Sequence, residues 1–107
     1  MTLEKYEKTL DIWANEEREK AAEAKQAGDE RLRSIHLMKA SMLGDMLKVL
    51  GKVELSGRTG TLEKIAAQQT AEAGRFKMQE DYDAAEKSEI KAATIRRALE
   101  LIENGDE

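Results

Sequence analysis

The chain has 107 residues, a formal net charge of −4 at pH 7, 37% charged residues and only 4% aromatic residues. It contains no cysteine, which excludes disulfide scaffolds, thiolate nucleophiles and cysteine zinc sites. The shortage of aromatic and β-branched residues argues against a sheet, and the mild acidity argues against nucleic-acid binding, which needs a basic stripe.

Hydropathy gives no sign of a membrane or secretory segment. No apolar run approaches the roughly 20 residues that a membrane-spanning helix needs. The first six residues are polar or charged at most positions and lack the apolar region of a signal peptide. We therefore expect a cytoplasmic protein that makes no contact with a membrane.

The first expected helix begins after Thr2, a favourable N-cap residue, and ends at Gly28. Glycine suits the left-handed conformation that ends many helices, and Asp29 can cap the helix that follows. One face of this helix repeats at steps of three and four residues, and its members become smaller along the chain: Leu3, Tyr6, Leu10, Trp13, Glu17, Ala21, Ala24 and Ala27. The alanines favour close approach of a neighbouring helix.

The second expected helix covers about residues 30–53 and is apolar over more than half of its circumference. A helix that is apolar on two sides lies in the centre of a bundle or also contacts a partner. A chain of this length has no deep centre, so we expect the second face to form a subunit interface in a dimer or higher homo-oligomer. The predicted interface residues are Met38, Met42, Leu43, Met46, Leu47 and Leu50.

Residues 54–60 are predicted to form a linker, because two glycines, a serine and a threonine interrupt the helical pattern. Glycines allow successive N–H groups to point at one place, hydroxyl groups add donors, and an arginine adds a fork that can hold two phosphate oxygens. A helix capped by Thr61 would follow. The segment is therefore either a plain linker or an anion site made of Ser56, Gly57, Arg58, Thr59, Gly60 and Thr61.

The last part of the chain is predicted to be helical over residues 61–78 and 82–103, with Gly105 as the stop. Residues 78–81 contain neither glycine nor proline, so one long bent helix is the alternative to two helices. Residues 9–53 match residues 61–105 when the two segments are aligned without gaps, with pairs such as Leu10 and Leu62. If this self-match is a true repeat, the break at residues 28–29 predicts another at residues 80–81.

These elements predict an all-α fold in a single domain over residues 1–107. The helices would form antiparallel hairpins in a small bundle of four helices, or of three if the last is long and bent. The segments Ala27-Gly28-Asp29 and Glu80-Asp81-Tyr82, each followed by an alanine-containing helix, resemble the helix pairs of tetratricopeptide-like and MIT-like modules. The tetratricopeptide signature residues of the first helix and the proline are missing, so no ligand residues carry over.

The residue types that support catalysis are sparse. His36 is the one histidine, which excludes a paired Glu-x-x-His metal site, and we interpret it as a residue at the edge of the core or interface. Glu17 and Gln69 interrupt equivalent apolar stripes, and they either fix helix register by hydrogen bonds, lie exposed at a splayed end, or bind a ligand. Arg96 is expected to pair with Glu100 on its own helix.

We therefore expect neither an enzyme nor a protein with a metal or cofactor. The preferred interpretation is a helical interaction protein, such as an adaptor, an assembly factor or a phage-type inhibitor, that self-associates through residues 30–53. The alternative is an oligomer that sequesters a phosphorylated metabolite or a nucleotide at residues 56–61.

Overall fold

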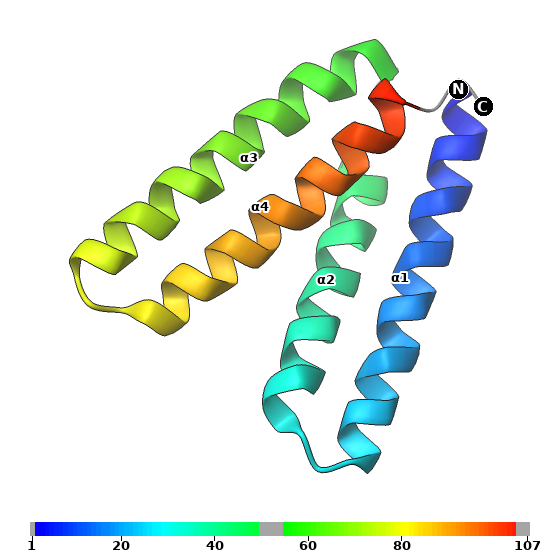
Figure 1. Ribbon diagram of the computed structural model, residues 1–107. Helices are drawn as coiled ribbons and strands as arrows, with labels where there is room; N and C mark the ends of the chain where they lie inside the picture. Colours follow the sequence, from blue (N-terminus) through cyan, green and yellow to red (C-terminus); the bar gives the residue numbers. More distant parts are fainter. Residues whose placement is uncertain (1, 50–54, 105–107) are drawn as a thin grey trace. The chain divides into compact units, whose positions relative to one another are not determined.

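The computed structural model describes residues 2–49 and 55–104. Within these ranges the chain forms α-helices and no strand: α1 (Leu3–Gln26), α2 (Glu30–Val49), α3 (Leu55–Met78) and α4 (Tyr82–Glu103). The predicted all-α fold with four helices is confirmed. The alternative of one long C-terminal helix is wrong, because a turn separates α3 from α4 (Figure 1).

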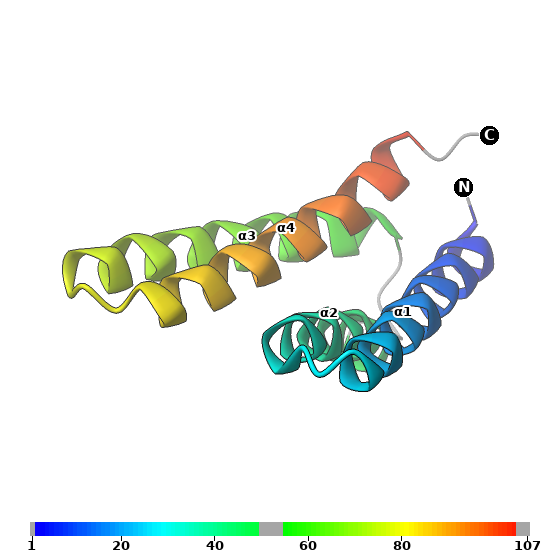
Figure 2. The ribbon, with the colours of Figure 1, turned by 60° about the horizontal axis from the view of Figure 1, so that its bottom comes forward.

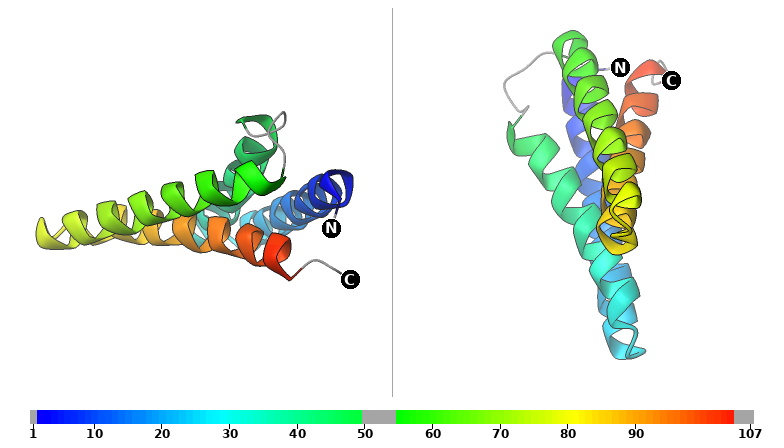
Figure 3. Two further views of the ribbon diagram at one scale, coloured as in Figure 1. Left: turned by 90° about the horizontal axis from the view of Figure 1, so that it is seen from above. Right: turned by 90° about the vertical axis from the view of Figure 1, so that its left-hand side faces the viewer.

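The helices contact one another in two pairs. The chain divides into two compact units, Met1–Val53 and Glu54–Glu107. In the first, α1 packs along α2, and in the second, α3 packs along α4. Figure 2 and Figure 3 show each pair side by side from other directions. We call α1 with α2 the first helix pair and α3 with α4 the second helix pair. The single domain, the bundle and the oligomer that the sequence predicts stay predictions.

The boundaries of the two pairs correspond to one another in the register of the self-match, which pairs Leu10 with Leu62. The same register pairs the first residues of α1 and α3, Leu3 and Leu55, and also their last residues. It likewise pairs the first residues of α2 and α4, Glu30 and Tyr82. The turn of the second pair therefore lies where the self-match predicts it. Whether the repeat arose by duplication stays a prediction.

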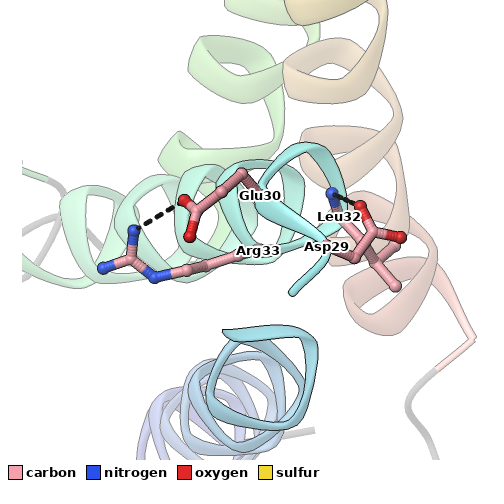
Figure 4. A network of polar contacts seen from close by, with 4 residues as sticks. All are labelled: Asp29, Glu30, Leu32 and Arg33. Atoms are coloured by element: carbon pink, nitrogen blue, oxygen red, sulfur yellow. Dashed lines mark hydrogen bonds and ion pairs between the residues drawn. The ribbon is translucent and has the colours of Figure 1, made fainter. Parts of the chain in front are cut away.

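The turn between α1 and α2 satisfies the end of one helix and the start of the next. Gly28 has a φ of 77°, its N–H donates to the Lys25 carbonyl, and the Asp29 N–H donates to the Ala24 carbonyl. These two hydrogen bonds together form a Schellman motif. Asp29 then caps α2 by accepting a 3.0 Å hydrogen bond from the Leu32 N–H (Figure 4). The predicted roles of Gly28 and Asp29 are confirmed.

The turn between α3 and α4 repeats this pattern with a different residue at its centre. Glu80 has a φ of 61°, its N–H donates to the Lys77 carbonyl, and the Asp81 N–H donates to the Phe76 carbonyl. Asp81 caps α4 by accepting a hydrogen bond from the Ala84 N–H. A glutamate therefore occupies the left-handed position that glycine occupies in the first pair, although its Cβ disfavours that conformation.

The seam between the helices of each pair repeats at alternating steps of three and four residues. In the first pair the seam contains Leu10, Ala14, Glu17, Ala21 and Ala24 from α1, with His36, Ala40, Leu43 and Leu47 from α2. In the second pair it contains Leu62, Ala66, Gln69, Ala73 and Phe76 from α3, with Ala85, Ser88, Ala92, Ile95 and Leu99 from α4. The alternation is that of a coiled coil, and the alanines allow close approach.

Opposite substitutions at the two turns should change stability in opposite directions. Gly28→Ala should lower the free energy of unfolding by about 1 kcal/mol, because alanine disfavours the left-handed conformation. The added Cβ would meet no atom within 4 Å, so the cost is conformational. Glu80→Gly should raise the free energy of unfolding by a similar amount. Urea denaturation measures the free energy of unfolding of both variants, and Glu80→Ala is the control. If Gly28→Ala and Glu80→Gly changed the free energy of unfolding in the same direction, the turn assignment would be contradicted.

Candidate functional site

A buried polar contact joins the two helices of the first pair. Glu17 of α1 and His36 of α2 are linked by a hydrogen bond of 2.6 Å between Oε2 and Nδ1. The Glu17 side chain is 5% exposed and that of His36 is 13% exposed. An ionised carboxylate only accepts hydrogen bonds, so with Glu17 ionised it is Nδ1 that carries the shared hydrogen. The contact gives a buried carboxyl group the partner that it needs.

This contact selects one of the three interpretations of Glu17. The side chain is neither exposed at a splayed end nor aimed at an external ligand, but bonded across the seam. His36 lies at the edge of the same seam, as expected for a structural histidine. At the equivalent positions of the second pair, Gln69 is half-buried and Ser88 is buried, and no hydrogen bond joins them. The polar bridge is therefore particular to the first pair.

The chemistry open to this contact is limited. A glutamate bonded to a histidine can orient the ring and carry a proton, but two groups do not make a closed metal site. No group of three or more His, Cys, Asp or Glu side chains that could hold a metal ion occurs over residues 2–49 and 55–104. We infer that the contact between Glu17 and His36 fixes the register of α1 against α2.

A double-mutant cycle should detect this contact. Glu17→Ala and His36→Ala should each destabilise the protein, and the interaction energy from the cycle should be about 1–2 kcal/mol, because both groups are buried. The same cycle with Gln69→Ala and Ser88→Ala is the matched control and should give a value near zero. An equal interaction energy in both cycles would contradict the assignment.

The structure corrects the prediction of a linker at residues 54–60 and of an anion-binding loop at residues 56–61. Residues 55–61 form the first two turns of α3, and residue 54 lies outside the described residues. Thr61 is not an N-cap, since its hydroxyl donates to the Gly57 carbonyl one turn earlier. The backbone N–H groups from Thr59 onward belong to the helical hydrogen-bond ladder and cannot converge on a ligand.

The position of Arg58 removes the main reason for the predicted anion site. Its side chain is 0% exposed, whereas the prediction needed an accessible guanidinium fork. In the register of the self-match, Arg58 takes the place in the second pair that the equally buried Tyr6 takes in the first. Long arginine stems cover apolar surface as a tyrosine ring does. Phosphate binding at Ser56, Gly57, Thr59 and Gly60 stays a prediction without its loop.

Arg58 should therefore matter for stability. Arg58→Ala should lower the free energy of unfolding by about 2 kcal/mol or more, because it removes a large buried side chain. Arg75→Ala is the control: Arg75 lies on the same helix, is 70% exposed, and should cost less than about 0.5 kcal/mol. Thermal denaturation of both variants compares them, and an unchanged melting temperature for Arg58→Ala would contradict its buried position.

The residues predicted for the subunit interface fall into two groups. Leu43 and Met46 are buried, and Leu43 belongs to the seam with α1. Met38, Met42 and Leu47 are half-buried, and Leu50 lies outside the described residues. The methionines at 38 and 42 are thus the predicted interface residues that keep accessible surface away from the seam.

Two polar contacts between α3 and α4 were not found from the sequence. Arg96 donates a 2.6 Å hydrogen bond to the Thr70 hydroxyl, and Lys77 forms an ion pair with Glu89. The expected pairing of Arg96 with Glu100 is wrong, because the guanidinium reaches across to α3. These contacts join residues far apart in the sequence, and spacing along one helix does not reveal them.

Comparisons with known proteins add no assignment. No family model, curated protein or solved structure matches this chain, so the resemblance to helix-pair modules gains no support. None of the helices in the described part of the chain has both the length and the apolar character needed to cross a bilayer.

Proposed function

We propose that this protein is a non-enzymatic helical interaction protein that self-associates through α2. The observation that carries the proposal is a second apolar stripe on α2, separate from the seam with α1. Ile35, Met38 and Met42 repeat at steps of three and four residues and are all half-buried. Successive helical residues are rotated by about 100°, so Met42 lies well away from Leu43 of the seam.

The size of the helix pairs supports the same proposal. Each unit has only about fifty residues, and units of this size bury a smaller fraction of their surface on folding than larger domains do. A helix that is apolar on two sides gains stability when its second side is also covered. Methionine suits such a surface, because its flexible side chain adapts to different partners.

The chemistry of the described residues favours an interaction protein over an enzyme. The buried polar contact links the helices of one pair, and the arginine expected in an anion site is buried. The partner proposed for the α2 stripe is a second copy of this chain, in a dimer or a higher oligomer. An adaptor, assembly factor or inhibitor would then offer its remaining helical surfaces to other proteins.

Light scattering after size-exclusion chromatography tests the proposal. At micromolar concentration the measured mass should be two or more times the 12.0 kDa of one chain. Met38→Glu and Met42→Glu should shift the mass toward 12.0 kDa, because a carboxylate without a partner would have to be buried at the interface.

Leu37→Glu provides the matched control. Leu37 lies on the same helix and is 41% exposed, but it belongs neither to the stripe nor to the seam. This variant should keep the oligomer, and circular dichroism should show unchanged helicity for all three variants. A monomeric wild-type protein would overturn self-association, and dissociation by Leu37→Glu would overturn the assignment to the stripe.

A further inference from the structure

The turn between α3 and α4 exposes two large apolar side chains. Met78 is the last residue of α3 and is 87% exposed, and Tyr82 is the first residue of α4 and is 64% exposed. They are the most exposed large hydrophobic residues in the described part of the chain. Neither side chain contributes to the seam between the two helices, so folding of this pair does not require them.

The first helix pair shows what such a turn needs. With the same Schellman motif and the same aspartate cap, it has Gln26, Gly28 and Glu30 where the second pair has Met78, Glu80 and Tyr82. Each of the three residues in the first pair suits an exposed helix end. The second turn therefore replaces two polar residues with exposed apolar ones and a glycine with a carboxylate, without any change in the fold of the turn.

The charge around these side chains is negative. Residues 78–83 include three carboxylates and no lysine or arginine. Asp81 caps α4 and Asp83 pairs with Lys87. The Glu80 carboxylate has neither a hydrogen bond nor an ion pair within residues 2–49 and 55–104. Residues 54–107 carry eight basic and twelve acidic side chains, whereas residues 1–53 carry ten of each. Glu54, Asp106 and Glu107 lie outside the described residues, so α3 and α4 with their turn carry nine acidic and eight basic side chains. The excess of negative charge within the pair therefore lies at its turn.

We propose that the α3–α4 turn, with Met78, Glu80 and Tyr82, is a docking site for a cationic, partly apolar segment of a protein partner. The Tyr82 ring offers a face to a guanidinium or ammonium group, and Met78 adapts to an aliphatic side chain. The Glu80 carboxylate can bind an arginine of the partner through two parallel hydrogen bonds. The surrounding negative charge attracts such a segment from a distance. This site is separate from the proposed self-association of α2.

Titration calorimetry with two synthetic peptides of equal charge tests the proposal. One peptide interleaves arginine with leucine, and the other interleaves arginine with glycine. The wild-type protein should bind the arginine–leucine peptide at least tenfold more tightly, since only this peptide has side chains for the Met78 and Tyr82 surface. Binding of both should weaken with added salt.

A variant that gives the second turn the polar residues of the first separates the apolar contribution from the charge. Met78→Gln combined with Tyr82→Glu installs two of the three residues of the first turn, keeps Glu80 and adds one negative charge. The tenfold preference for the arginine–leucine peptide should disappear even though the protein has become more acidic. Circular dichroism should show a folded variant, because both side chains are exposed in the wild type.

Ile12→Gln is the matched control, because Ile12 is also an exposed apolar residue but lies on α1. This variant should retain the full preference. Absence of binding by the wild type, or an equal affinity for both peptides, would overturn the proposal. A change in oligomeric mass caused by the turn variant would also overturn it, by identifying a second copy of the chain as the occupant.

Discussion

The fold of this protein depends on the narrow seam within each helix pair. Two helices can bury only one face of each against the other, and here that face is defined by alternating steps of three and four residues. Alanine occupies many of these positions, so little side-chain volume separates the helices along much of the seam. The remaining apolar residues of the chain are then either buried against a partner or exposed to solvent. For this reason both proposals concern surfaces outside the seam.

The helices and the turn at residues 27–29 could be predicted from the sequence, because periodicity and capping are local signals. The helical start of α3 could not be predicted from local composition. Glycine, serine and threonine in residues 56–61 signal a loop, but burial of Arg58 and Leu62 overrides that signal. The register of the self-match, when extended beyond its first residues 9 and 61 toward the N-terminus, places residues 55–60 on the first turns of α1.

The candidate site was predictable only in part. The interruption of an apolar stripe by Glu17 indicated a hydrogen-bonded polar group, but its partner could not be named, because the pairing depends on how α2 folds back along α1. The same limit applies to Arg96 and Thr70, which lie on different helices. Sequence spacing predicts contacts within a helix, whereas contacts between helices need the register that the turn and the seam determine together.

The two helix pairs act as internal references for each other. Positions that agree between them, such as Leu10 with Leu62 and the capping aspartates, are those that the shared frame requires. Positions that differ between the pairs are not required for the shared seam and turn, because a helix pair forms with either residue. The first pair places a polar bridge in its seam, and the second places exposed apolar side chains and a carboxylate at its turn. Because a helix pair forms with either residue at these positions, the bridge adds stability and register to the first pair alone, and the exposed residues at the second turn are the observation on which the proposed docking site rests.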